Sequence, residues 1–234
     1  TFDGNFGSDP LDFHRRHLGV VSIDKADMKI LTSGEGNEWK GMFAAGADDL
    51  FYLGATAQKG PQLYLKKVNQ SSQSLSGNLY PTKFPEKQLY TPKSVEFKSL
   101  DGLTIYGQVF DNGDGKSNKP AVVFVHGGPS RQMLLGWHYS DYYANAYAMN
   151  QYLAQQGFVV LSVNYRLGIG YGFEFQHPSN FLAAPEYWDV KAAGEWLAKQ
   201  SNVNPKKIGL WGGSYGGYLT ALGLGKDSKL FTAG

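Results

Sequence analysis

The spacing of apolar and polar residues divides this chain of 234 residues into two regions. In residues 1–80, short apolar runs are separated by Gly, Asp, Asn and Ser, without the period of about 3.6 residues that marks an amphipathic helix. Short runs bounded by turn residues predict β-strands. Pro81, Pro85 and Pro92 then follow one another closely, as in a linker. We therefore expect residues 1–91 to be an all-β region that ends in a linker.

A weak internal repeat lies within this β region. Residues 17–20 align with 62–65 at an offset of 45 positions, and residues 31–34 align with 74–77. A period of this length is typical of a β-propeller, in which four-stranded blades stack on one another. Two similar hairpins in a β-sandwich would give the same pattern, so both architectures stay open. One or two blades cannot close a ring of at least about four, so a propeller would be represented here by its last blade or blades.

After the prolines the pattern changes. Residues 94–100 and 103–110 alternate apolar and polar positions around Asp101-Gly102, a strong signal for an antiparallel hairpin. Apolar strands and helical segments then alternate, with strands expected at 121–125, 158–163 and 207–211 and helices at 143–155, 187–199 and from Tyr215 onward. This alternation predicts a parallel sheet covered by helices on both faces. Residues 92–234 are therefore expected to form an α/β domain.

The helix predicted over 187–199 has one apolar face. The expected core positions on that face are Val190, Ala193, Trp196 and Leu197. Asp189 lies near the predicted start of the helix, where a carboxylate suits the unpaired amides of the first turn. The pattern thus predicts a core helix with an acidic cap.

Composition narrows the classes of function. The 30 glycines and an aromatic share of 15% are typical of many turns and strands and argue against a helical bundle. Charged residues make up only 18% of the chain, the net charge is +2, and no basic stripe is present, so nucleic-acid binding is not expected. The absence of cysteine excludes disulfides, thiolate catalysis and thiolate zinc sites.

The sequence contains no membrane span and no evident leader. No run of about 18 apolar residues is present, and residues 1–10 lack both the basic start and the apolar stretch of a signal peptide. These features are compatible with a soluble protein of the cytoplasm, the periplasm or the exterior. They leave the oligomeric state open.

The sharpest chemical motif is GxSxG at residues 212–216. An apolar strand ends at Trp211 and a helix can begin after Ser214, so the serine falls on the turn between them. This context predicts a nucleophile elbow, in which a strained serine is lifted above the sheet. Ser214 is then the candidate nucleophile, and the N–H of Tyr215 at the helix N-terminus is a candidate oxyanion donor. A tight strand-to-helix turn without catalysis is the structural alternative.

A second motif, His126-Gly127-Gly128-Pro129, follows the first parallel strand. Adjacent glycines at such a position let backbone amides point into a cleft, which is how the other half of an oxyanion hole is made. His126 is not expected to be the triad base, because in α/β-hydrolases the histidine follows the serine along the chain. It is expected to orient the loop or to contribute to the oxyanion site, with a purely structural role as the alternative.

A third motif, NYRLGIGYG at residues 164–172, follows the second parallel strand. A glycine-rich loop can cradle phosphate, but this one lacks the Lys and Ser/Thr of a P-loop, and the spacing of GxGxxG fails. No nucleotide cofactor is therefore expected. Arg166 is expected to anchor this loop or a nearby carboxylate through bidentate hydrogen bonds.

The three motifs, in this order and with these gaps, resemble the prolyl oligopeptidase family of serine peptidases. Within it the chain is most similar to the acylaminoacyl-peptidase and dipeptidyl-peptidase branch. The resemblance covers essentially the whole chain, including the β repeat. It implies a β-propeller joined to an α/β-hydrolase domain that cleaves short peptides, with no cofactor and no metal.

The resemblance also assigns residues. It implies Ser214 as the nucleophile and the backbone amides of Gly128 and Tyr215 as the oxyanion hole. The Tyr215 ring would line the pocket for the residue before the scissile bond. In some branches a tyrosine occupies the position of His126 and its hydroxyl stabilises the oxyanion, so a contribution of the His126 side chain stays open.

The chain departs from the family after the serine. The segment after Ser214 contains one acid, Asp227, and no histidine. A triad needs an imidazole to accept the serine proton and a carboxylate to orient it. All the histidines precede the serine, namely His14, His17, His126, His138 and His177. About three parallel strands are also too few for the complete hydrolase sheet that the family implies.

We therefore expect an internal fragment of a larger serine peptidase. Residues 1–91 would be the C-terminal end of a β-propeller plus a linker, and residues 92–234 the N-terminal part of an α/β-hydrolase domain. The triad Asp and His would lie beyond the end of the chain, and the fragment alone would be inactive. The sheet edge at the strand over 207–211 would be exposed and prone to aggregation.

Two other functions stay open on the sequence. A serine esterase or lipase would use the same elbow and the same HGGP-type loop. The β repeat before Pro92 favours the peptidase, because simple esterases lack a propeller. A non-catalytic propeller scaffold with a dead hydrolase domain is the third, and the intact serine and oxyanion motifs argue against it. Peptide substrates are the expected partners, with no nucleic acid and no membrane span.

Overall fold

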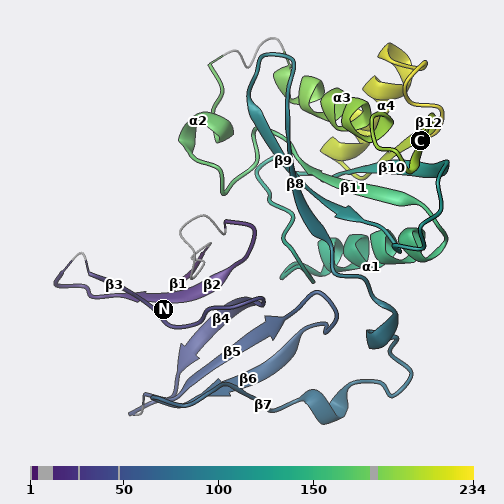
Figure 1. Ribbon diagram of the computed structural model, residues 1–234. Helices are drawn as coiled ribbons and strands as arrows, with labels where there is room; N and C mark the ends of the chain where they lie inside the picture. Colours follow the sequence, from purple (N-terminus) through teal and green to yellow (C-terminus); the bar gives the residue numbers. More distant parts are fainter. Residues whose placement is uncertain (1, 5–12, 26, 47, 180–183) are drawn as a thin grey trace. The chain divides into compact units, whose positions relative to one another are not determined.

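The chain forms two compact units in a computed structural model that describes residues 2–4, 13–25, 27–46, 48–179 and 184–234 (Figure 1). Unit 1 comprises Thr1–Thr91 and Leu134–Tyr147, and unit 2 comprises Pro92–Met133 and Ala148–Gly234. The segment 134–147, which follows the HGGP motif closely, therefore belongs to the β-rich unit. Nothing in the sequence pattern predicted this assignment.

Unit 1 contains two antiparallel sheets. The first has the order β1 (Phe2–Gly4), β2 (His17–Val21), β3 (Met28–Ile30), and the second the order β4 (Asn37–Phe43), β5 (Leu50–Ala55), β6 (Gln62–Lys66), β7 (Gln73–Ser74). Two short 3-10 helices, Gly77–Leu79 and Glu86–Gln88, follow β7. The second sheet is a meander in which each strand pairs with the next one along the chain.

The internal repeat of the sequence falls on equivalent hairpins of the two sheets, β2–β3 and β6–β7. In the first hairpin the N–H of Leu18 donates to the Thr32 hydroxyl at 2.8 Å. In the second, the N–H of Leu63 donates to the Ser76 hydroxyl at 2.9 Å. A hydroxyl just after the second strand thus accepts the same kind of bond in both hairpins, although Thr32 and Ser76 differ by one position in the sequence repeat.

A buried polar network joins the two sheets of unit 1. The Nδ1 atom of His17, on β2, lies 2.5 Å from Oε2 of Glu38, on β4. The Thr32 hydroxyl donates to the same oxygen at 3.0 Å. His17 is fully buried and Glu38 nearly so. Because a buried charge is costly unless it is paired, this network favours one arrangement of the two sheets.

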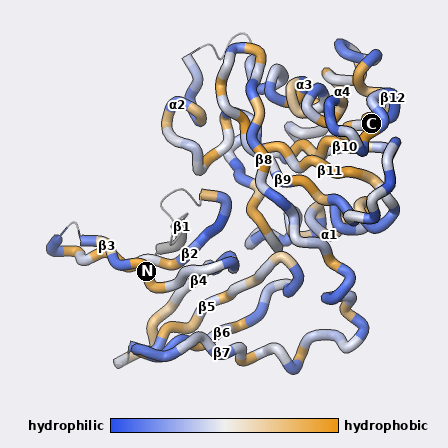
Figure 2. Tube along the Cα trace, viewed as in Figure 1, coloured by the Kyte–Doolittle hydropathy of each residue, from blue (hydrophilic) through white to orange (hydrophobic). Residues whose placement is uncertain are grey.

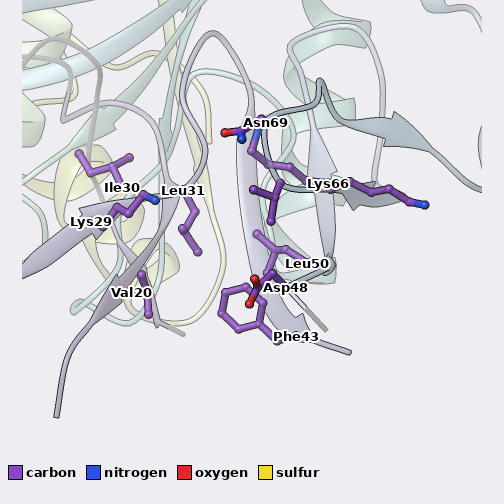
Figure 3. Close-up of a pocket in the computed structure, with 11 residues that line it drawn as sticks. Val20, Lys29, Ile30, Leu31, Phe43, Asp48, Leu50, Lys66 and Asn69 are labelled. Atoms are coloured by element: carbon purple, nitrogen blue, oxygen red, sulfur yellow. The ribbon is translucent and has the colours of Figure 1, made fainter. Parts of the chain in front are cut away.

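A cavity of about 530 Å³ lies between these two sheets, where their apolar side chains do not fill the space (Figure 3). Its lining residues are Val20, Lys29, Ile30, Leu31, Phe43, Asp48, Leu50, Lys66, Lys67, Val68 and Asn69. None of the candidate catalytic residues is among them. This cavity is therefore separate from the chemistry that the motifs predict.

Unit 2 contains a five-stranded sheet in the order β12–β10–β11–β9–β8. Its strands are β8 (Lys93–Lys98), β9 (Thr104–Phe110), β10 (Lys119–Val125), β11 (Val159–Asn164) and β12 (Val203–Gly212). Strand β10 lies between β12 and β11 and runs parallel to both, as predicted. The hairpin β8–β9 turns at Asp101-Gly102, where Gly102 has φ +86°, and joins β11 in antiparallel pairing.

Helices cover both faces of this sheet. The helices are α1 (Asp141–Gln155), α2 (Phe173–Gln176), α3 (Pro185–Ala198) and α4 (Tyr215–Lys226). Helices α3 and α4 lie on one side of the sheet, and residues 148–155 of α1 lie on the other (Figure 1). All six residues of β11 are buried, and Figure 2 shows β10 and β11 as the most hydrophobic strands. Such strands, covered on both sides, explain the near-continuous apolar runs of the sequence.

Helix α3 corrects one expectation. The expected core positions are buried or partly buried: Val190, Ala193, Leu197 and Trp196. The prediction that Asp189 caps the helix is wrong, because α3 begins at Pro185 and Asp189 lies a full turn further on. The Asp189 carboxylate is fully buried and pairs with Arg166.

The expectation of an open edge at β12 is also wrong in part. The N–H of Leu210 donates to the carbonyl of Ala233 at 2.9 Å, and the N–H of Thr232 donates to the carbonyl of Ile208 at 2.8 Å. This stretch of the edge is therefore paired by backbone from the same chain.

A helix with the length and hydropathy of a membrane span does not occur among the described residues.

The buried network of unit 1 yields a prediction. Glu38→Ala leaves the buried His17 and Thr32 without their shared acceptor, so we expect the free energy of unfolding of unit 1 to fall by about 3 kcal/mol. Native-state hydrogen exchange at the amides of β2 and β4 in the full-length protein measures this loss. The exposed Glu35→Ala is the control and should change little. Equal exchange rates in both variants would contradict the role given to the network.

Candidate active site

The three motif segments leave the sheet at the same edge. Val125 at the end of β10 pairs with Gly212 on β12 and with Val163 on β11. Because these strands are parallel, their carboxyl ends meet there, which is where ligands bind in open α/β sheets. The segments that follow these positions are the motif residues 126–129, 164–172 and 213–216.

Ser214 occupies the turn between β12 and α4. Its φ is 56° and its ψ −124°, a conformation that residues with a side chain rarely adopt. The residue is exposed to solvent. A serine in a strained turn between a parallel strand and a helix is the geometry of a nucleophile elbow.

The glycines on either side of Ser214 are required by the closeness of β10. A Cβ atom at Gly212 would collide with the carbonyl oxygen of Val125. A Cβ atom at Gly216 would collide with the carbonyl oxygens of both Val125 and His126. The turn can therefore approach the HGGP loop only because both positions lack a side chain.

Two backbone amides at this edge are candidate oxyanion donors. Tyr215 is the first residue of α4, so its N–H has no partner within the helix. Gly128 has φ +125°, a conformation that favours glycine. In the part of the chain that the structure describes, no protein hydrogen bond takes either N–H. Both groups therefore remain available to a developing negative charge.

His126 is buried and offers no proton to an oxyanion in this structure. Its Nδ1 lies 2.8 Å from the carbonyl oxygen of Gly127, which can only accept, so Nδ1 carries the hydrogen. Burial lowers the pKa of His126 to about 4, so the ring is neutral at pH 7 and Nε2 carries no hydrogen. The ring stacks on Tyr165 with centroids 4.3 Å apart. Of the roles considered for this residue, orienting the loop fits this geometry.

Arg166 belongs to the glycine-rich loop, and its buried side chain binds residues of two other segments. Its guanidinium donates to both oxygens of Asp189, at 2.8 and 2.7 Å. It also donates to both oxygens of Asp101, at 2.5 and 2.9 Å, and to the Ser99 hydroxyl at 3.1 Å. These bidentate pairs join the β8–β9 turn, the loop after β11 and helix α3.

The HGGP loop is held by contacts that the sequence did not predict. The side chain of Asn164 accepts the N–H of Met133 at 2.7 Å and donates to its carbonyl at 2.9 Å. Gln108 donates to the same carbonyl. The N–H of Ile169 donates to the carbonyl of Arg131 at 3.2 Å. The glycine-rich loop thus packs against residues 126–133 and holds them by hydrogen bonds. The only local sequence signal for these contacts was an Asn at the end of an apolar strand.

Glu186 is a further contact residue that the sequence pattern did not reveal. It lies in the first turn of α3, is 3% exposed, and accepts a hydrogen bond from the Tyr215 hydroxyl at 2.6 Å. Burial and the neighbouring carboxylate raise the pKa of Tyr215 well above its usual value, so this hydroxyl stays protonated. A buried acid therefore contacts the residue next to the candidate nucleophile.

The described residues do not complete a triad around Ser214. Asp227 follows α4 at the opposite end from Ser214, about 18 Å away along the helix axis, and it binds Lys191 and Tyr187. Among the described residues no imidazole hydrogen bonds to Ser214. The same residues contain no group of three or more acidic or histidine side chains that could hold a metal ion.

The chain is similar to several known proteins. Residues 145–234 match the model of the prolyl oligopeptidase family. This part of the chain is therefore similar to that family. The chain is 32% identical to dipeptidyl aminopeptidase BIII of Pseudoxanthomonas mexicana over 80% of its own length and 27% of the relative. It is 30% identical to the acylamino-acid-releasing enzyme of Mus musculus over 60% of its length and 18% of that enzyme.

Solved structures show the same fold. An acylaminoacyl peptidase of Pyrococcus horikoshii matches 93% of the chain with a TM-score of 0.71 at 25% identity. A puromycin hydrolase matches 94% with a TM-score of 0.75 at 18% identity, which is a likeness of fold. The chain spans 33% of each of these structures, so it covers about a third of their length.

The close approach at the elbow yields a prediction. Gly216→Ala places a methyl group against two backbone carbonyls that cannot move aside, so we expect fluorophosphonate labelling of the full-length protein to slow at least about tenfold. Gly217→Ala is the matched control, because its Cβ would meet only the Gly212 carbonyl, at 3.4 Å. Equal labelling rates of the Gly216→Ala and Gly217→Ala variants would show that the elbow does not need a glycine at position 216.

Asp101 yields a pH dependence. The Arg166 guanidinium lowers the pKa of Asp101 to about 2, below its usual value of about 3.9. A lowered pKa contributes stability that is present above about pH 4 and is lost as pH falls toward 2. Asp101→Asn should therefore weaken the acid dependence of unfolding in that window, measured as the thermal midpoint of the full-length protein from pH 2 to 7. An unchanged slope would show that the pair contributes nothing to acid stability.

Proposed function

We propose that the protein is a serine peptidase that hydrolyses short peptides through an acyl-enzyme on Ser214. One observation carries the proposal: the exposed Ser214 sits in a strained turn at the carboxyl edge of a parallel sheet, directly beside the HGGP loop. The family match of residues 145–234 supports it.

The proposed mechanism follows from this geometry. The Ser214 oxygen attacks the carbonyl carbon of the scissile bond, and its proton passes to a base. The negative charge that develops on the carbonyl oxygen is stabilised by the N–H groups of Tyr215 and Gly128 and by the N-terminus of α4. The amine leaves with a proton, and water then releases the acyl group from the serine.

We propose that the base and its orienting acid come from outside residues 1–234. Their order in α/β-hydrolases is Ser, then Asp or Glu, then His, and the described residues offer no such pair beside Ser214. The relatives are about three times as long as this chain, which supports the proposal. Residues 1–234 alone should accordingly be inactive.

We propose that the two units belong to the two domains that the structural neighbours combine, a β-propeller and an α/β-hydrolase. The four-stranded meander β4–β7 has the form of one blade, and the repeated hairpin β2–β3 has the form of part of the blade before it. The linker that ends at residue 91 would then lead into residues 92–234, the N-terminal part of the hydrolase domain.

Short peptides are the proposed substrates. The relatives are named as dipeptidyl aminopeptidases and acylamino-acid-releasing enzymes. A structural neighbour is an acylaminoacyl peptidase solved with a peptide chloromethyl ketone, Z-Gly-Gly-Phe-chloromethyl ketone. The partly buried Tyr215 ring, next to Ser214, would line the pocket for the residue before the scissile bond. No cofactor takes part in this scheme.

The test is a substrate panel assayed with the full-length protein. We expect cleavage of acylaminoacyl or dipeptidyl nitroanilides, and a loss of kcat by about 10⁴-fold or more in Ser214→Ala. The exposed Ser201→Ala is the control and should retain full activity. Cleavage of nitrophenyl esters with no cleavage of any peptide amide would select an esterase instead. Equal activity of Ser214→Ala and wild type would remove Ser214 from the mechanism.

A further inference from the structure

We infer that Glu186 is a positioning residue for the elbow and acts through the side chain of Tyr215, an inference that rests on the proposed function. Glu186 does not contact Ser214. It holds the hydroxyl of Tyr215, whose backbone N–H is the proposed oxyanion donor.

The burial of Glu186 shows that its contact is more than a surface pair. The residue is 3% exposed, and its Oε2 atom makes no hydrogen bond to any described residue. Burying a carboxylate oxygen without a hydrogen bond costs free energy, so the one bond that Glu186 makes through Oε1 carries weight. The partner of Oε1 is the Tyr215 hydroxyl, at 2.6 Å. Glu186 lies in the first turn of α3, where the helix dipole favours a negative charge.

The position of Tyr215 explains how this bond reaches the site. Tyr215 is the first residue of α4 and follows Ser214 directly. The φ and ψ of Ser214 lie in a strained region, and such conformations persist only where the surroundings fix them. The contact of Gly212 and Gly216 with the end of β10 fixes the backbone of the turn from one side. The Tyr215–Glu186 bond fixes it from a second element, α3.

Beyond Glu186 and Tyr215, the contacts continue through Tyr165 toward the HGGP loop. The rings of Tyr215 and Tyr165 are nearly parallel, with centroids 6.5 Å apart. The Tyr165 hydroxyl donates to the carbonyl of His126 at 2.8 Å. Glu186 therefore lies at one end of a contact path that leads through Tyr215 to His126, two residues before Gly128. Its loss should slow the chemical step more than it weakens substrate binding.

The experiment measures the fluorophosphonate labelling rate, kcat and KM of the full-length protein and its variants. Glu186→Ala should lower the labelling rate and kcat about tenfold or more, with KM changing less than kcat. Glu186→Gln keeps an oxygen that can accept the Tyr215 hydroxyl, so it should restore most of the rate. Tyr215→Phe should lose a similar amount, and adding Glu186→Ala to it should cost little more, because both changes break the same bond.

The controls separate the possible failures. Glu195→Ala removes an exposed acid from the same helix and should leave the labelling rate unchanged. Near-ultraviolet circular dichroism of each variant identifies a loss of folding. Wild type that fails to label refutes the proposed function itself. Wild type that labels, with a folded Glu186→Ala that labels equally fast, overturns only the role of Glu186, as does a Glu186→Gln that falls as far as Glu186→Ala.

Discussion

The contact between the end of β10 and the turn around Ser214 is the constraint on which the site depends. The carbonyl oxygen of Val125 leaves no room for a side chain at Gly212 or Gly216. Because β10 and β12 are parallel and in register there, the HGGP loop and the elbow emerge together. The positive φ of Ser214 is a consequence, since the chain must turn sharply from strand to helix within this space.

Hydrogen bonds between buried polar groups fix the segments that surround that contact. Arg166 ties the β8–β9 turn, the loop after β11 and helix α3 together through two carboxylates. Asn164 fixes the HGGP loop at Met133 by acting as both donor and acceptor. Such groups are stable inside a protein only when their bonds are made, so they favour one conformation of the edge over its alternatives. A site that acts by preorganised backbone amides needs this rigidity.

The sequence predicted what depends on local patterns, and missed what depends on long-range partners. The order of strands and helices, the hairpin at Asp101-Gly102 and the turn at Ser214 followed from apolar periodicity and glycine placement. Asp189 was assigned to a cap because its partner lies 23 residues away in the chain. The segment 134–147 joins unit 1 through backbone hydrogen bonds, such as the one from the Leu135 N–H to the His14 carbonyl. The pattern of side chains does not predict such bonds.

A crystal structure of the full-length protein inactivated with a fluorophosphonate would test the central claim most directly. The account predicts a phosphorus atom bonded to the Ser214 oxygen. It also predicts a phosphoryl oxygen within about 3 Å of the backbone nitrogens of Tyr215 and Gly128. A phosphorus on another residue, or a phosphoryl oxygen turned away from both nitrogens, would contradict it.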